Sequence, residues 1–419
     1  MRLPPFRPSR SLLSAQRTRL LAGLLLSSSQ AGLLSLDQFE RAKQLAVEEK
    51  WSNALPVESF LRRGGLLPNE DRSLAQRIPV IDVRAPCEFE KGHVPGAISV
   101  PLFTDNERAE VGTLYKKAGH DEAVHRGLEI VTAKGWEKLL APVAPHLSED
   151  GEVLVYCFRG GMRSGSVAWL LSQAPGLEVH TMAGGYKAFR HWSLETWEAC
   201  DRPVTIVGGP TGSGKTDVLH RLRDDLGAQV LDLEGDANHR GSAFGSLGRD
   251  PQPTNEHYEN LLALQWRSFE ASRPVFIEDE SHNVGKCGVP RGLWQRMRAP
   301  SAQVLRLQVP HAARVAKLVQ EYGVYEPTLL ADCVRRLNKK LGNDRVAHLC
   351  RLLEETQPPG LSQVADALLE HYYDDMYGYQ AKKRLEEMGP AAALELVECG
   401  SGDALENAKA LLARSEPRP

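Results

Sequence analysis

The sequence predicts an α/β protein made of two consecutive parallel-sheet units followed by a helical C-terminal region. Short apolar runs alternate with helical patterns up to about residue 310, and this alternation is typical of parallel strands joined by helices. In the second unit a glycine-rich loop stands between a strand and a helix. Beyond residue 310 only helical periodicity is expected.

The strands of the first unit are read from three short apolar runs. One begins at Pro79 in PVIDVR, and the others are EVLVYC (152–157) and LEVHTMAGG (177–185). Helical patterns such as WEKLLAPVAPHL and SVAWLLSQA separate them. This order implies a parallel sheet.

The second unit begins near Cys200–Pro203 with the strand VTIV, the glycine loop and an amphipathic helix. AQVLDLEG (228–235) and RPVFIEDES (273–281) are interpreted as further buried strands, because each apolar run ends in carboxylates and is bounded by Gly or Pro. The later segments HAARVAKLVQEYG, LADCVRRLNKKLG, LSQVADALLEHYY and AAALELVE are expected to be helices.

The composition is that of a folded protein with more than one domain. The chain has 419 residues, 42% hydrophobic and 25% charged, which allows two or three cores and excludes disordered and collagen-like classes. The formal net charge of −3 gives no overall attraction to nucleic acid, so an RNA would have to bind local basic patches. Seven dispersed cysteines without a CxxC pair favour a reducing compartment.

The first 36 residues differ from the rest of the chain. They contain no acidic residue and five arginines among many Ser and Leu, a composition typical of an organellar transit peptide. A disordered tail, a misassigned start and a signal anchor are the alternatives, although the apolar part is shorter than the ~20 residues of a membrane span. We expect no membrane association. The location is mitochondrial if residues 1–36 target the chain, and cytoplasmic if the extension is not cleaved.

Cys157 stands at the end of a predicted strand, in YCFRGGMRS, and a helix is expected from about Ser164. Loop amides and a helix N-terminus stabilise negative charge, and neighbouring arginines add to this effect. The thiol should therefore ionise more readily than a free cysteine and hold a chalcogen as persulfide or perselenide. The other residues of this candidate loop are Arg159, Gly160, Gly161, Arg163 and Ser164. The alternative is a buried structural cysteine, which is the interpretation for the other six.

The segment GPTGSGKT (209–216) satisfies the phosphate-loop pattern GxxxxGK[ST], between a strand and a helix as that pattern requires. Its amides can cradle a diphosphate at the helix N-terminus. Lys215 would reach the outer phosphate, and Thr216 would bind Mg²⁺. The phosphate-binding candidates are Gly209, Gly212, Gly214, Lys215 and Thr216.

A second carboxylate for this site is expected in VFIEDES, where Asp279 or Glu280 ends a strand. Thr216 and Asp279 together are the candidate Mg²⁺ ligands, and a solvated turn is the alternative for the acids. The loop 234–248, with His239 and Arg240, is expected beside the phosphate site, unless it is an ordinary surface loop.

Three segments of the first unit resemble the successive motifs of the rhodanese family. They are IDVRAPCEFEKGHVPGAISVP, YCFRGGMRS and GGYKAFR (184–190). The resemblance implies that Cys157 is a chalcogen-carrying nucleophile, and that Asp82 and Arg84 mainly hold the fold together.

A rhodanese domain joined to a P-loop domain resembles the tRNA 2-selenouridine synthase family. ERAEVGTLYKKAGHDEAV (107–124), LEGDANHRGSAFG and PQPTNEHYEN (251–260) also look like this family, and the likeness extends over roughly residues 75–300. HYYDDMYGY (371–379) lacks the proline of the family's His-Tyr-Asp-Pro-like sequence. The expected fold is a rhodanese-like α/β domain, a P-loop NTPase-like α/β domain and a helical C-terminal region. The expected ranges are an N-terminal extension at 1–70, the rhodanese-like domain at 71–200, the core of the P-loop domain at 201–310 and the helical C-terminal region at 311–419.

The resemblance implies an enzyme that converts wobble 2-thiouridine in tRNA to 2-selenouridine. The sulfur would first be S-geranylated from geranyl diphosphate, and the geranylthio group would then be replaced by selenium from selenophosphate. Expected partners are tRNA, geranyl diphosphate, selenophosphate and the synthase that makes it. RRLNKKLGNDR (335–345) and PRGLWQRMR (290–298), with Trp294, are the candidate tRNA patches. A solvated helix face is the alternative for each.

Two other functions fit the same motifs. One is a sulfurtransferase fused to an ATP-dependent small-molecule kinase, which would need a second acceptor-binding loop and would turn over ATP. The other is a non-catalytic nucleotide-binding module with a rhodanese scaffold, against which the intact Cys157 loop argues.

Overall fold

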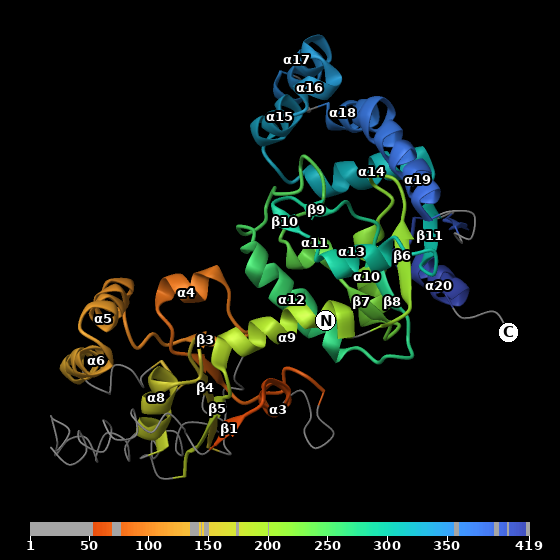
Figure 1. Ribbon diagram of the computed structural model, residues 1–419. Helices are drawn as coiled ribbons and strands as arrows, with labels where there is room; N and C mark the ends of the chain where they lie inside the picture. The colour runs from red at the N-terminus through yellow and green to blue at the C-terminus, as the bar shows by residue number, and fades with distance from the viewer. Residues whose placement is uncertain are drawn as a thin grey trace. The chain divides into compact units, whose positions relative to one another are not determined.

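The computed structural model describes residues 53–68, 77–134, 142–143, 145, 151–172, 176–199, 201–355, 360–388, 394–399 and 402–415. The chain divides into two compact units between Thr196 and Trp197 (Figure 1). Residues 1–36, with the predicted transit peptide, lie outside the described ranges, as do Cys200 and most of the helical pattern at 136–147. Within those ranges, no helix is long and apolar enough to cross a membrane.

The first unit is a five-stranded parallel sheet in the order β1-β5-β4-β2-β3. Its strands are β1 (Ala54–Leu55), β2 (Val80–Asp82), β3 (Ile98–Ser99), β4 (Glu152–Tyr156) and β5 (Glu178–Met182). Its helices are α3 (Val57–Arg63), α4 (Pro86–Lys91), α5 (Asp105–Lys117), α6 (His120–Lys134), α8 (Met162–Ser172) and α9 (Gly185–Ala199), the last running across the division. The three expected strands are present. β1 and α3, which the sequence had placed in an extension, belong to this unit.

A buried ion pair stabilises the carboxyl edge of this sheet. Arg84, 2% exposed, donates from Nη2 to Asp82 at 2.6 Å and to the carbonyl of Gly92 at 2.7 Å. Its guanidinium carbon lies 3.8 Å from the ring centre of Tyr186 and 5.7 Å from that of Tyr156. A buried charge is tolerated only when it is paired in this way. Asp82 and Arg84 therefore have the structural position that the family resemblance implied.

The second unit is built on a parallel sheet in the order β12-β11-β6-β8-β7. The strands are β6 (Val204–Gly208), β7 (Gln229–Leu231), β8 (Val275–Glu278), β11 (Gln303–Gln308) and β12 (Leu394–Glu398), and an antiparallel pair is formed by β9 (Asn283–Val284) and β10 (Cys287–Gly288). The helices near the sheet are α10 (Lys215–Asp224), α11 (Leu233–Asp236), α12 (Asn255–Ser268), α13 (Arg291–Met297) and α20 (Ala404–Ser415).

A helical region with its own core follows β11. It contains α14 (His311–Tyr322), α15 (Pro327–Arg335), α16 (Asn338–Leu341), α17 (Asn343–Glu354), α18 (Leu361–Leu368), the π-helical turn η2 (Leu369–Tyr373) and α19 (Asp374–Met388). In Figure 1, α15, α16 and α17 stand away from the sheet.

The expected helix at AAALELVE was wrong, because Leu394–Glu398 form the edge strand β12. This strand pairs in parallel with β11, and Val397 is fully buried. Leu411 of α20 then packs with Leu222 of α10 in the core on one side of the sheet. The chain thus leaves the sheet after β11, forms the helical region and returns to the sheet.

Candidate functional site

The first candidate site is the Cys157 loop, between β4 and α8. Cys157 is only 2% exposed, and its Sγ lies 3.2 Å from Oγ of Ser164, one of the loop residues predicted from the sequence. The Ser164 hydroxyl also donates to the carbonyl of Gly161 at 3.1 Å. When it does so, its oxygen is the acceptor for the thiol proton. After the thiol has lost that proton, the same hydroxyl can turn and donate to the sulfur.

The loop is closed by close backbone packing against the turn between β5 and α9. The amide of Tyr186 donates to the carbonyl of Cys157 at 2.9 Å. Gly160 has φ +68°, and a Cβ there would lie 2.4 Å from the carbonyl oxygen of Met182. A Cβ on Gly185 would lie 2.3 Å from the carbonyl oxygen of Cys157. Only glycine fits these two positions, so the glycines create the narrow bowl around the sulfur.

The two arginines of the loop have different surroundings. Arg163 donates to Glu88 at 2.9 Å, and Glu88 also pairs with Arg108 at 3.3 Å. Burial opposes ionisation of Glu88, but the hydrogen bond and charge of Arg163 outweigh it and lower the pKa of this carboxyl. Arg159 is exposed and lies 5.9 Å from the ring of Phe158. The charge of Arg163 is therefore already balanced, and Arg159 is the exposed cation of the loop.

Within the described ranges, the other cysteines match the structural interpretation with one exception. Cys287, Cys333, Cys350 and Cys399 are buried, whereas Cys87 is exposed. Cys87 was wrongly grouped with the buried ones. It lies in the first turn of α4, where its amide donates to Asp105 at 3.0 Å and its thiol is also hydrogen-bonded to that carboxylate.

The second candidate site is the P-loop, between β6 and α10. Its three predicted glycines have positive φ, at Gly209 (150°), Gly212 (79°) and Gly214 (78°). Lys215 begins α10 and donates from Nζ to the carbonyl of Gly209 at 2.9 Å. Free amides at a helix N-terminus bind anions, so the loop has the geometry of a phosphate cradle.

Buried carboxylates lie beside the P-loop. Thr216 donates from Oγ1 to Glu234 at 2.9 Å. Burial, reinforced by the charge of Glu234, raises the pKa of Glu280 well above its usual range, and Lys215 opposes that shift. Burial and the charge of Asp232 likewise raise the pKa of Glu278, whose Oε2 has no hydrogen-bond partner among the described residues. A cation placed here would be strongly attracted.

The structure places Glu234, rather than Asp279 as expected, at the hydroxyl of Thr216. Asp279 pairs with Arg384 of α19 at 2.8 Å, and the carboxylate at the hydroxyl of Thr216 is Glu234. Sequence reasoning missed Glu234, which lies in α11, two residues beyond Asp232, the acid that directly follows β7. The acids of LDLEGD, at the end of this apolar run, were the signal that could have found it.

The side chains of His239 and Arg240 make their contacts with groups outside the P-loop. Nδ1 of His239 accepts from the amide of Gly241 at 3.1 Å, and burial lowers its pKa. Arg240 pairs with Glu321 of α14 at 3.0 Å. A Cβ on Gly241 would lie 2.7 Å from Glu280. The backbone of this loop, rather than its two predicted side chains, therefore approaches the carboxylates.

The helical region covers the outer side of the P-loop. Arg314 donates to the carbonyl of Thr211 at 3.3 Å and is held by two bonds to Asp374, at 2.7 and 2.8 Å. Nζ of Lys215 lies 5.1 Å from the ring centre of Tyr377, which is hydrogen-bonded to Thr211. The segment 371–379 thus supplies groups at the P-loop, and the sequence alone gave it no role.

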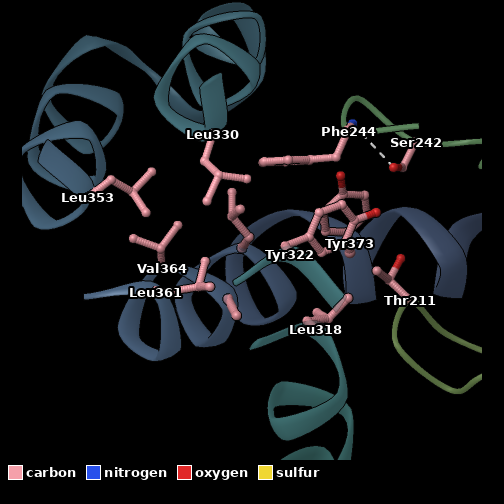
Figure 2. Close-up of a pocket in the computed structure, with 12 residues that line it drawn as sticks. Thr211, Ser242, Phe244, Leu318, Tyr322, Leu330, Leu353, Leu361, Val364 and Tyr373 are labelled. Atoms are coloured by element: carbon pink, nitrogen blue, oxygen red, sulfur yellow. Dashed lines mark hydrogen bonds between the residues drawn. The ribbon is translucent and has the colours of Figure 1, made fainter. Parts of the chain in front are cut away.

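An apolar pocket lies beside the same loop (Figure 2). Thr211 of the P-loop and Ser242 line it, together with aliphatic and aromatic side chains of α14, α15, α17, α18 and η2. Phe244 donates its amide to Oγ of Ser242 at 3.2 Å.

The two predicted basic patches contain both paired and exposed cations. In 335–345, Arg335 pairs with Glu354 at 2.7 Å, while Lys339, Lys340 and Arg345 are exposed. In 290–298, Arg296 pairs with Asp201 at 3.4 Å, and the guanidinium carbon of Arg298 lies 4.2 Å from the ring centre of Trp294.

Comparison with known proteins covers both units. The family described as "tRNA 2-selenouridine synthase AAA domain" matches residues 202–397, and the rhodanese-like domain family matches residues 69–191. Several bacterial relatives of the chain are named tRNA 2-selenouridine synthase. That of Pseudomonas putida is 36% identical over 374 residues, 81% of this chain and 96% of the relative. That of Hydrogenovibrio crunogenus is 36% identical, covering 76% and 94% of the two chains. That of Bordetella bronchiseptica is 36% identical, covering 73% and 89%.

Proposed function

This chain belongs to the tRNA 2-selenouridine synthase family, and from that premise we propose that it is a transferase converting wobble 2-thiouridine in tRNA to 2-selenouridine. The observation that carries the proposal is the presence in one chain of two anion-stabilising loops, one with a thiol and one with a phosphate cradle. They suit a reaction with a chalcogen step and a diphosphate-releasing step.

In the first step we propose that the thiouridine sulfur attacks C1 of geranyl diphosphate. A C–S bond forms, the C1–O bond breaks, diphosphate leaves and the uridine loses its N3 proton. The P-loop amides and Lys215 hold the departing diphosphate, whose negative charge grows as the C–O bond breaks. Glu280, a buried carboxyl beside Lys215 with a raised pKa, can accept the N3 proton. This proton can also leave to water.

The residues present fit a Mg²⁺ ion at this loop. The Thr216 hydroxyl and Glu234 carboxylate are hard oxygen donors, and a P-loop Mg²⁺ takes few protein ligands because substrate phosphates and waters complete its shell. Accordingly, no group of three or more His, Cys, Asp or Glu in the described ranges forms a metal site by itself. A bound Mg²⁺ would neutralise diphosphate charge. Thr216 and Glu234 would hold it.

In the second step selenium from selenophosphate replaces the geranylthio group. With one water, the products are 2-selenouridine, geranylthiol and phosphate, so the net step needs no oxidant or reductant. We propose Cys157 as the nucleophile of this step, because its sulfur lies in a loop shaped by Gly160 and Gly185. The Cys157 thiolate would form a bond to C2 of the geranylated base as geranylthiol leaves, and selenide, released from selenophosphate as water takes the phosphoryl group, would then displace the Cys157 sulfur.

The test is a reconstitution from purified full chain, thiolated tRNA, Mg²⁺ and geranyl diphosphate without nucleotide. Mass spectrometry of the nucleosides should show geranylthiouridine, and selenouridine after selenophosphate is added. Strict dependence on ATP would instead support the kinase alternative.

A further inference from the structure

We propose that the apolar pocket beside the P-loop binds the hydrocarbon chain of the diphosphate donor and limits its length. The name chain pocket is used for the cavity lined by Phe244, Tyr322, Leu330, Leu353, Val364 and Leu368 together with Thr211. The inference rests on the proposed function, because it assigns a binding site to the hydrocarbon chain of the donor, which the P-loop does not hold.

The position of the pocket is the first argument. Thr211 belongs to the P-loop and also lines the pocket. A Cβ on Gly212 would lie 3.2 Å from Cγ of Leu318, another lining residue. When the phosphates of a ligand bind the loop amides, a group attached to them can therefore enter the adjacent pocket.

The chemistry of the wall is the second argument. The hydroxyl of Ser242 is already hydrogen-bonded to Tyr322 and Tyr373 and accepts the amide of Phe244. Burial raises the pKa of Tyr322 to about 12. The few polar groups thus satisfy one another, and the rest of the wall is hydrocarbon. Such a wall suits an alkenyl chain and offers no pattern of donors and acceptors for a nucleobase.

The arrangement of the wall is the third argument. Figure 2 shows Thr211 and Ser242 at one side of the pocket, and Leu353 and Val364 at the opposite side. A chain that enters beside Thr211 would end against Leu353 and Val364. Leu353 is 1% exposed and Val364 is 2% exposed, so both are fixed in the helical core. Their size should therefore limit how many carbons fit.

The experiment measures binding to the full chain with three probes: inorganic diphosphate, and the unreactive S-thiolodiphosphates of a ten-carbon (geranyl) and a fifteen-carbon (farnesyl) chain. The wild type should bind the geranyl probe at least tenfold more tightly than diphosphate, since each buried methylene contributes roughly fourfold in affinity. Val364→Phe fills the pocket and should weaken the binding of the geranyl probe about tenfold. The affinity for inorganic diphosphate should stay unchanged.

Leu353→Ala enlarges the far end and should shift the farnesyl-to-geranyl affinity ratio about tenfold toward farnesyl. Leu349→Ala is the matched control, because Leu349 is also 1% exposed on α17 but does not line the pocket. It should destabilise the helical core in the same way and leave the ratio unchanged.

The outcomes separate this inference from the proposed donor. If the wild type binds the geranyl probe no better than diphosphate, the donor assignment fails and the inference fails with it. If the wild type prefers the geranyl probe but neither Val364→Phe nor Leu353→Ala changes chain selectivity relative to Leu349→Ala, the donor assignment stands and the chain pocket is refuted.

Discussion

The Cys157 loop and the P-loop share one local design and differ in what surrounds it. Each follows a buried strand of a parallel sheet, contains at least one glycine with positive φ and ends at the start of a helix. Around Cys157 the neighbours are backbone groups of the β5–α9 turn and one hydroxyl. Around Lys215 they are charged and aromatic side chains from distant segments, such as Glu234 and Tyr377.

The difference shows what each loop requires of the fold. The first holds one reactive atom, so a rigid backbone bowl is sufficient. Under the proposed function the second loop binds several negative charges and releases them, and groups from α11, β8, α14 and α19 contribute to its electrostatic environment. We therefore expect that substituting the reactive side chain of a loop will affect one reaction step. Substituting a supporting residue will instead show which contacts that loop depends on.

The largest expected effect comes from Cys157→Ser, which replaces the thiol by a much weaker nucleophile of similar shape. Selenium incorporation should fall by about 10³-fold or more. Geranylation of thiolated tRNA should continue, because the P-loop is unchanged. Nucleoside mass spectrometry measures both products in one sample. Selenouridine at the wild-type rate would remove Cys157 from the mechanism.

Lys215→Ala should produce the opposite pattern with a somewhat smaller loss. Without the ammonium, charge on the departing diphosphate is less stabilised, and geranylation should slow by about 10²–10³-fold. Selenation of tRNA supplied already geranylated should stay within a few-fold of wild type. If that second reaction is lost equally, the two loops do not act in separate steps.

The third prediction tests the backbone bowl of the first loop. A Cβ on Gly160 would lie 2.4 Å from the carbonyl oxygen of Met182, at a φ of +68°, whereas one on Gly161 meets nothing within 4 Å. Gly160→Ala should therefore destabilise the first unit by about 2–4 kcal/mol, and Gly161→Ala by less than about 0.5 kcal/mol. Hydrogen exchange of β4 amides in the full chain measures both. Equal effects would mean that the close packing is not what shapes the loop.

The parts of each site that are contiguous in sequence could be predicted, and the parts that fold onto it could not. Cys157, Ser164 and the glycines of both loops lie within short motifs whose strand–turn–helix context is visible in the residues. Arg314 and Tyr377 lie 98 and 161 residues after Thr216, the last residue of the P-loop, and nothing in their own segments indicates that tertiary packing brings them there. Glu234 is an intermediate case, since the acids after the apolar run of β7 were visible in the sequence, but the short helix α11 that places Glu234 beside Thr216 was not.

The missed strand β12 has a similar cause. In AAALELVE the alanines, leucines and glutamates favour a helix intrinsically, whereas pairing with β11 and burial of Val397 favour a strand. Strand preference depends on such neighbours more than on the residues themselves. The expectation of a helix therefore failed for Leu394–Glu398, where the chain returns to the sheet after the helical region.

The smallest expected effect concerns the carboxylates that distinguish the P-loop from the Cys157 loop. Glu278 is buried, and its pKa is raised because burial and the charges of Asp232 and Glu234 disfavour ionisation. A carboxyl with a raised folded-state pKa binds its proton more tightly in the folded state than in the unfolded state. Its contribution to stability is therefore full below the unfolded pKa of about 4.3 and is lost as the pH rises through the folded-state pKa.

Glu278→Gln removes this charge and keeps the Oε1 acceptor that the Glu234 amide uses at 2.7 Å. At pH 8 the second unit should gain on the order of 1 kcal/mol of unfolding free energy, the usual size of a single-substitution effect, with little gain at pH 5. Hydrogen exchange of β8 amides, corrected for intrinsic rates, measures this gain. Glu270→Gln is the control, because Glu270 is 65% exposed and its loss should change stability by less than about 0.5 kcal/mol. A gain in Glu278→Gln that is equal at both pH values would show that packing, and not the buried charge, limits the stability of this site.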